Sequence, residues 1–428
     1  MEVCIISREI IKPSSPTPPH LRTYKLSLLD QLNFDESHFP VILFYSSKTC
    51  ENTTKVSDNL KTSLAETLTH YYPFAGRVKD KFSIDCDDSG AVFIEANVDS
   101  NMSEILKRHE YDQLAQLQPF NDNSPCTDER MVVIQVNHFS CGGVAICVCF
   151  KYVLADGKAA ANFIRSWSAV ACGDNYAKNA NFDCSTVFPP QDLQLQDLWK
   201  CFEQNVSYGE AIGKRFTIDG TKIAALREKI RDGGKRLHWP TRFEAVSALI
   251  WGATMAAARE RDDVKQTNVA FVPMNMEKRL NRSLSEQCFS HMCLSTIVKW
   301  PMEKAMDYNT ISGKVHESIM MVDDNYVRKI NEGGGFLDDL RNLNEESSKL
   351  NVCFISSWCK FSLYEADFGW GKPAWAGTFL KCINLIVLSD TCDSDGIEAW
   401  VVLSEQDMAR FEENPNILAY ASPFKPSI

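Results

Sequence analysis

The fold is decided by the stretch Val144-Ala-Ile-Cys-Val-Cys-Phe-Lys-Tyr152-Val-Leu-Ala-Asp156-Gly157, which continues as Lys158-Ala-Ala-Ala-Asn-Phe-Ile-Arg-Ser-Trp167. The apolar run that begins at Val144 predicts a buried strand, which ends in a polar turn at Asp156 and Gly157. Beyond the turn, apolar residues recur at helical spacing, so one face of a helix can pack against a sheet. We therefore expect a strand, a turn and a helix, with the chemistry beside the turn.

Length and charge narrow the class of protein. A chain of 428 residues exceeds one ordinary core, because domains average about 150 residues. The formal net charge of -11 argues against nucleic-acid and anionic-membrane partners, which require a broad basic surface. No stretch reaches the ~20 apolar residues of a membrane span, and the N-terminus lacks the apolar region of a secretory signal. We expect a cytoplasmic protein.

The cysteines and the periodicity of the chain give the rest of the organisation. No cysteine pair has C-x-x-C spacing, so no structural zinc site or other metal is expected. Helices are predicted at residues 56–67 and 241–257, and residues 82–90 and 91–96 predict two strands joined as a hairpin by an Asp-Ser-Gly turn. A polar, irregular segment near residues 191–212 is the best candidate for a crossing between domains.

Three further stretches are distinctive: Asp367-Phe-Gly369-Trp370-Gly371, residues 72–77 and residues 118–120. They resemble signatures of the BAHD family, the acyl-CoA-dependent plant acyltransferases. Residues 11–18, 86–90, 357–359 and 395–399 resemble its alkaloid-acylating branch. The resemblance covers essentially the whole chain.

The resemblance implies an α/β fold of two similar mixed-sheet domains. Their expected bounds are 1–190 and 213–428, joined by the crossover segment 191–212. The implied reaction moves an acyl group, acetyl rather than malonyl, from acyl-CoA to a hydroxyl or amine of a small-molecule acceptor, expected to be a monoterpene indole alkaloid. No permanently bound cofactor is implied, and a monomer is expected.

The family's active-site histidine is missing from its motif, His-x-x-x-Asp-Gly. Aligning Asp156 and Gly157 with that motif places Tyr152 at the histidine position. A histidine there acts as general base, because its pKa lies near neutrality. A tyrosine, with a pKa of about 10, needs about 4 kcal/mol to ionise at neutral pH.

Three explanations of this change stay open. Tyr152 relays or donates a hydrogen bond in a working acyltransferase, for instance one that acylates an amine. Alternatively, the protein has lost acyl transfer and binds an alkaloid or promotes another reaction of it. In the third, another group replaces the base, and the candidate is His291, which precedes a predicted strand; the plain alternative for His291 is a structural residue.

The remaining motif residues are expected to be architectural or to bind the co-substrate. By resemblance, Asp156 points away from the substrate and pairs with an arginine, and Gly157 permits a tight turn. Asp367 is expected to be ion-paired, with Gly369, Trp370 and Gly371 shaping its loop. The CoA phosphates need cations, and the residues at the matching positions are Arg242, Lys278 and Arg279.

Overall fold

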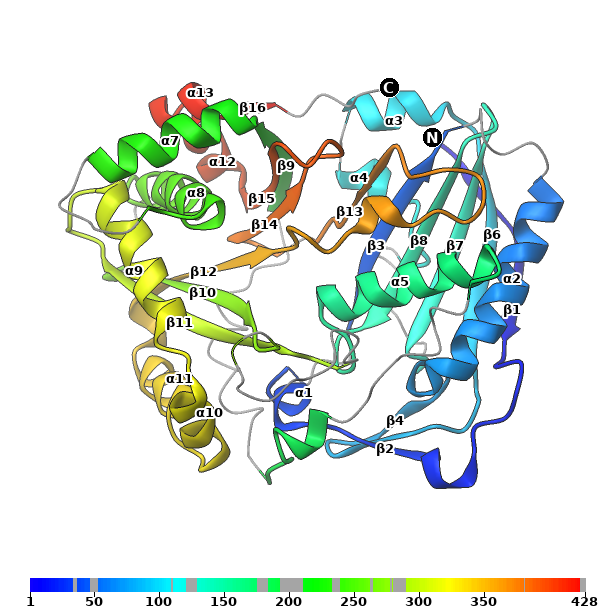
Figure 1. The fold of residues 1–428 in the computed structure, drawn as a ribbon. Helices are drawn as coiled ribbons and strands as arrows, with labels where there is room; N and C mark the ends of the chain where they lie inside the picture. The colour runs from blue at the N-terminus through cyan, green and yellow to red at the C-terminus, as the bar shows by residue number, and fades with distance from the viewer. Residues whose placement is uncertain are drawn as a thin grey trace.

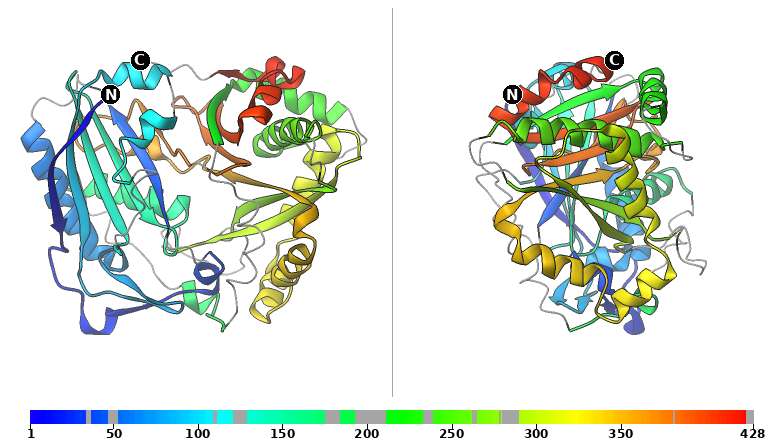
Figure 2. Two further views of the ribbon diagram at one scale, coloured as in Figure 1. Left: turned by 180° about the vertical axis from the view of Figure 1, so that it is seen from behind. Right: turned by 90° about the vertical axis from the view of Figure 1, so that its left-hand side faces the viewer.

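The computed structural model describes residues 1–33, 37–46, 53–108, 111–120, 129–174, 184–192, 211–232, 239–261, 265–277, 279, 290–380 and 382–423. Two large mixed sheets stand side by side, and helices cover each of them (Figures 1 and 2). The expected α/β fold of two mixed-sheet halves is confirmed. Residues 193–210 of the expected crossover lie outside the described residues. None of the described helices is long and apolar enough to cross a membrane.

The first sheet is built almost wholly from the N-terminal half. Its strands, in spatial order, are β1 (Val3–Ile11), β6 (Ala91–Val98), β7 (Val132–Phe139), β8 (Val144–Lys151), β3 (His38–Tyr45) and β13 (Trp375–Gly377). Only the β6 and β7 pair is parallel. Helices α2 (Thr53–His70) and α5 (Gly157–Ala171) pack together against one face of this sheet (Figure 1). The short helices α3 (Met102–Arg108) and α4 (Tyr111–Ala115) follow β6.

The second sheet belongs to the C-terminal half. Its spatial order is β11 (Cys293–Pro301), β10 (Thr267–Asn275), β12 (Leu350–Ser357), β14 (Leu385–Asp390), β15 (Ile397–Ser404), β9 (Ala211–Ile218) and β16 (Ser422–Pro423). The buried helix α8 (Arg242–Ala258) packs with α7 (Gly220–Asp232), α9 (Tyr308–Met320), α12 (Glu405–Glu412) and α13 (Pro415–Tyr420). Helices α10 (Asp324–Asn331) and α11 (Phe336–Glu345) contribute apolar side chains to the core at the end of the sheet formed by β10 and β11.

One strand crosses from the C-terminal half into the first sheet. β13 pairs with β3 in antiparallel register, with Trp375 opposite Phe44. Two hydrogen bonds support the crossing: the Tyr45 hydroxyl donates to the Ala366 carbonyl at 2.7 Å, and the Thr378 hydroxyl donates to the Pro40 carbonyl at 2.7 Å. The edge strand of the first sheet therefore comes from the C-terminal half of the chain.

The expected hairpin at residues 82–96 is wrong. β5 (Ser83–Asp85) lies in a separate three-stranded sheet, between β2 (Thr23–Lys25) and β4 (Arg77–Asp80). β6 instead pairs with β1 and β7 in the large sheet. Both segments have strand-like patterns, but alternation alone does not identify the pairing partner.

Candidate functional site

The strand, turn and helix predicted around Tyr152 are present as β8, the turn at 152–156 and α5. Every residue of β8 is buried. Asp156 is the N-cap of α5, and its Oδ1 accepts a hydrogen bond from the Ala159 amide at 2.8 Å. A carboxylate at this position satisfies an amide that the helix leaves unpaired.

Asp156 also ties the turn to the second sheet. Its Oδ2 accepts a hydrogen bond from the Met292 amide at 3.1 Å, immediately before β11. Two backbone amides therefore donate to this buried carboxylate, the Cys293 thiol also hydrogen-bonds to it, and the expected pairing with an arginine is not found among the described residues. The structure brings Asp156 and the Tyr152 turn against the segment that carries His291.

His291 and Tyr152 are in direct contact. The His291 Nε2 forms a hydrogen bond with the Tyr152 backbone carbonyl, and the two rings meet edge to face with centroids 4.9 Å apart. The Tyr152 ring also meets the Phe39 ring edge-on, at 5.6 Å. The His291 side chain is buried, whereas Tyr152 is half-buried. Two residues 139 positions apart thus form one cluster.

A buried carboxylate holds the His291 backbone. Asp30 lies in α1 (Leu28–Leu32), and its oxygens accept hydrogen bonds from the Ser27 amide and hydroxyl, the Ser290 hydroxyl and the His291 amide, at 2.7 to 3.0 Å. Burial raises the pKa of Asp30, while the charge of His291 and the hydrogen bonds from Ser27 and Ser290 oppose that shift.

Gly157 is required by the packing of an indole against the turn. A Cβ at this position would lie 2.7 Å from the Cε2 atom of Trp358, which is closer than side-chain carbons approach. Trp358 follows β12, and its ring meets Phe39 edge-on at 6.2 Å. Trp358, Phe39 and Tyr152 therefore form a continuous aromatic wall beside the turn.

The Asp367 carboxylate is bound by backbone amides of its own loop. The Asp367 Oδ1 accepts from the Gly369 and Gly371 amides, both at 2.8 Å, and the expected ion pair of Asp367 is not found among the described residues. Both glycines have positive φ, +97° and +102°, which other residues rarely adopt. The Trp370 ring stacks on Phe368 at 5.6 Å. These contacts give the loop a defined shape, and its architectural role stays a prediction.

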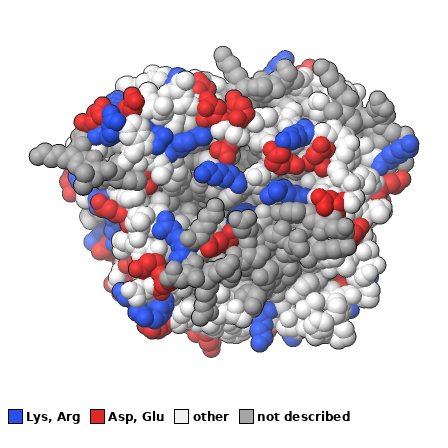
Figure 3. All heavy atoms as spheres, in the orientation of Figure 1, with Lys and Arg blue, Asp and Glu red and all other residues white. Residues whose placement is uncertain are grey.

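Two of the predicted cofactor-binding cations contact the backbone of neighbouring segments. Arg242 donates to the carbonyls of residues 394–396, and Arg279 donates to the Ile319 and Val322 carbonyls. Burial lowers the pKa of Arg279. Lys278 lies outside the described residues. Basic side chains gather among acidic ones near the middle of one face (Figure 3), but contact of Arg242 and Arg279 with CoA stays a prediction.

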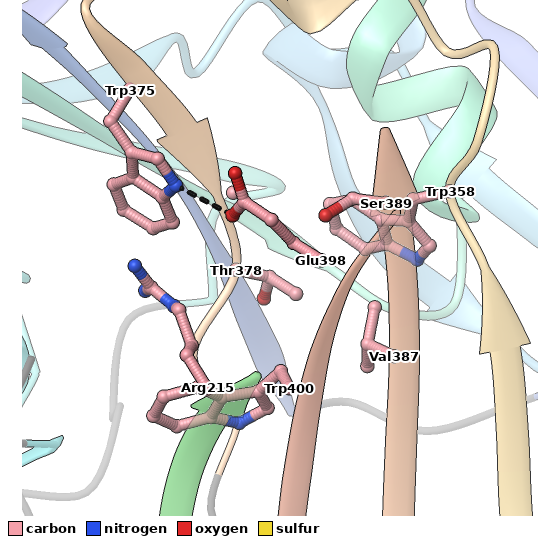
Figure 4. Close-up of a pocket in the computed structure, with 9 residues that line it drawn as sticks. Arg215, Trp358, Trp375, Thr378, Val387, Ser389, Glu398 and Trp400 are labelled. Carbon is pink, nitrogen blue, oxygen red and sulfur yellow. Dashed lines mark hydrogen bonds between the residues drawn. The ribbon is translucent and has the colours of Figure 1, made fainter. Parts of the chain in front are cut away.

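The sequence analysis missed a second polar cluster at the seam of the two sheets. Arg215 of β9 places its guanidinium carbon 3.5 Å from the Trp375 ring centroid and 5.2 Å from that of Trp400. The Trp375 indole donates to Glu398 Oε2 at 3.0 Å (Figure 4). Arg215 and Glu398 are 6% and 5% exposed. The available signal was a charged residue inside each of two apolar strand patterns.

Comparison with known proteins identifies the family. Residues 1–418 match the Transferase family. The chain is 49% identical to epi-neemfruitin B synthase L1AT of Melia azedarach, over 99% of each chain. It is 46% identical to limonoid 1-O-acetyltransferase of Citrus sinensis, also over 99% of each. The crystal structure of vinorine synthase superimposes with a TM-score of 0.82 at 31% identity, covering 96% of each chain.

Proposed function

The chain belongs to the BAHD acyltransferases, and we propose that it transfers an acetyl group from acetyl-CoA to a hydroxyl of a limonoid. Members of this family use acyl-CoA as co-substrate, and the relatives act in plant specialised metabolism. Near-complete coverage at 46% identity to a limonoid O-acetyltransferase supports the limonoid, the hydroxyl and the acetyl group. An alkaloid acceptor has weaker support, because vinorine synthase is 31% identical.

The proposed reaction requires a base. The acceptor oxygen attacks the thioester carbonyl carbon, a carbon–oxygen bond forms, and the carbon–sulfur bond to CoA breaks. The hydroxyl proton passes to the base and then to the departing CoA thiolate. A well-placed base contributes about 10²- to 10⁴-fold in rate.

The contact between His291 and Tyr152 is the observation that carries the assignment of this base. A carbonyl oxygen can only accept, so the Nε2 that bonds to it must carry a proton. In a neutral imidazole the other nitrogen, Nδ1, then holds the lone pair. We assign Nδ1 of His291 as the group that takes the acceptor proton.

The surroundings of His291 support this assignment. Asp30 accepts from the His291 amide at 3.0 Å, which fixes the backbone that carries the imidazole. The Tyr152 backbone carbonyl sets the tautomer and the Tyr152 ring packs against the imidazole. Tyr152 is therefore a positioning residue in this proposal, and Asp156 holds the turn and the start of β11 together.

The test is acetylation of limonoid alcohols that have an unacetylated 1-hydroxyl, with acetyl-CoA as donor and product detected by mass spectrometry. We expect His291→Ala to lower kcat by about 10²- to 10⁴-fold, with the KM for acetyl-CoA unchanged. Tyr152→Phe should retain most activity, because it keeps the ring and the backbone carbonyl.

His20→Ala is the control, because His20 is exposed and lies in the short helix at Pro19–Leu21. If Tyr152→Phe is inactive and His291→Ala is active, the base assignment is wrong. If the wild-type protein acetylates an alkaloid but no limonoid alcohol, the proposed acceptor class is wrong.

A further inference from the structure

An ion pair joins the two halves of the chain beside the Tyr152 turn. Lys158 lies in the first turn of α5, and its Nζ donates to Oε2 of Glu277, which follows β10. The Glu277 side chain is 5% exposed and the Lys158 side chain is 23% exposed. A charge that is buried to this degree is costly unless it is paired. The contact therefore fixes the two segments against each other.

The helix itself gives no reason for a lysine at this position. The N-terminus of a helix carries a partial positive charge, so a cation in its first turn is electrostatically unfavourable. Asp156, the N-cap, has the charge that the start of a helix prefers. The pairing with Glu277 in the other half accounts for Lys158 better than the stability of α5 does.

Glu277 is tied to the segment that carries His291 by strand pairing. β10 and β11 pair in antiparallel register up to Asn275, and beyond it the Met276 amide donates to the Met292 carbonyl at 2.7 Å. Continued by one position, this register sets Glu277 opposite His291. A shift of Glu277 therefore shifts the backbone on which the imidazole stands.

The start of α5 holds the ends of both strands. Asp156 accepts from the Met292 amide at 3.1 Å, and Lys158, two residues later, holds Glu277. The Cys293 thiol lies among these groups. Burial raises the pKa of this thiol, the Asp156 and Glu277 carboxylates raise it further, and the Lys158 ammonium opposes them. A closed ring of contacts thus runs from the helix to the two strand ends and back.

We propose that Lys158 and Glu277 are positioning residues for acetyl transfer, because their ion pair sets the place of the His291 imidazole on the Tyr152 turn. The inference rests on the proposed function, in which His291 is the base. The Tyr152 carbonyl that accepts from His291 belongs to the turn that leads into α5. A misplacement of about 1 Å can lower a rate about 10²-fold, so the pair controls the reaction without touching the acceptor.

Glu277→Gln tests the pair with the smallest change of shape, because it removes the charge and keeps the size of the side chain. We expect kcat for limonoid acetylation to fall by about 10- to 100-fold, with the KM for acetyl-CoA unchanged. Reversal of the pair, Lys158→Glu with Glu277→Lys, should recover most of that loss, because the opposite charges meet again at the same place.

The tautomer of His291 gives a readout that does not depend on turnover. NMR of protein with isotope-labelled histidine measures it, and the His291 signal is the one that His291→Ala removes. At a pH at which the imidazole is neutral, the wild type should show a protonated Nε2. Glu277→Gln should shift this signal toward a mixture of both tautomers, and the reversed pair should restore it.

Arg261→Met is the matched control, because Arg261 pairs with Asp407 at similar burial, with side chains 23% and 2% exposed. Arg261 lies next to Asn351, at the end of the second sheet remote from the turn. The control should leave kcat and the His291 signal unchanged. If it alters both as Glu277→Gln does, the effect is a general loss of stability and the inference is wrong.

Two further results decide between this inference and the proposed function. An unchanged His291 tautomer in Glu277→Gln overturns the positioning role, whatever the value of kcat, and a folded reversed pair that restores neither readout does so too. A tautomer that depends on Glu277, in a protein that acetylates no limonoid alcohol, supports the hold on His291 and overturns the proposed function instead.

Discussion

The Asp367 to Gly371 loop and the Tyr152 turn are both family motifs, and they differ in where their partners lie. The loop retains every residue of its motif, and Asp367 accepts from two amides within four positions of itself. The turn has Tyr152 where the resemblance places a histidine, and its contacts come from distant segments: Phe39, Met292 and His291. The Asp367 carboxylate is satisfied within its own motif, whereas the Asp156 turn takes one of its amide donors, from Met292, and the His291 contact from a distant segment.

On the alignment that the resemblance implies, this difference gives a physical reason for a change at the turn and none in the loop. In the loop, the two glycines need positive φ and the carboxylate needs both amides, so each substitution damages the same local structure. At the turn, only the position of an imidazole in space matters for base catalysis, and any element that reaches the turn can supply it. In our proposal His291, which precedes β11, supplies it from the opposite half of the chain.

The strongest test moves the base back to its family position. In the His291→Ala background, Tyr152→His should recover at least about tenfold of the 10²- to 10⁴-fold loss in kcat, because the imidazole returns to the same cluster from the other side. The measurement is kcat for limonoid acetylation in the single and double variants. Tyr152→Phe in the same background is the control and should recover nothing. A double variant as inactive as His291→Ala would show that an imidazole at position 152 cannot replace the imidazole at position 291.

A change in the loop should affect folding rather than chemistry. Asp367→Ala leaves the Gly369 and Gly371 amides without their acceptor, and we expect a loss of about 3 kcal/mol in the free energy of unfolding. Asp367→Asn keeps an acceptor oxygen and should lose less. Urea denaturation measures both. If Asp367→Ala unfolds like the wild type but loses kcat, the loop has a catalytic role and the comparison with the Tyr152 turn fails.

The sequence predicted the local elements well because their patterns are local. The strand at 144–150 and the helix after it are present as β8 and α5, and the helix at 241–257 is α8. The family resemblance also predicted the two mixed sheets. What it could not supply was pairing between distant segments, such as β5 with β2 and β13 with β3.

The candidate site shows the same limit. Sequence reasoning named Tyr152, Asp156 and His291, but the hydrogen bonds that join them depend on how β11 meets the turn. Arg215 and Glu398 are separated by most of the C-terminal half and lie on neighbouring strands, β9 and β15. Arg215, Glu398 and the indoles come together only because β9 and β15 pair in this register and because Trp375 of β13 contacts both side chains.

The smallest expected effect is a pH dependence of stability at Glu398, which is bonded to β13, the strand that follows the Asp367 to Gly371 loop. β13 is joined to the second sheet by the bond from Trp375 to Glu398, and burial raises the pKa of Glu398 from 4.5 to about 7. The folded protein therefore binds this proton more tightly than the unfolded chain does. The resulting stability is present below the unfolded pKa and is lost as the pH rises through the folded one.

As the pH rises from 5 to 8, deprotonation of Glu398 should lower the free energy of unfolding by about 2 kcal/mol. Glu398→Gln, which does not titrate, should remove that part of the pH dependence, whereas Glu365→Gln, at an exposed glutamate that pairs with Lys372, should leave it. Urea denaturation at the two pH values measures the difference. An unchanged pH dependence in Glu398→Gln would show that the proton affinity of Glu398 does not change on folding and would contradict the raised pKa.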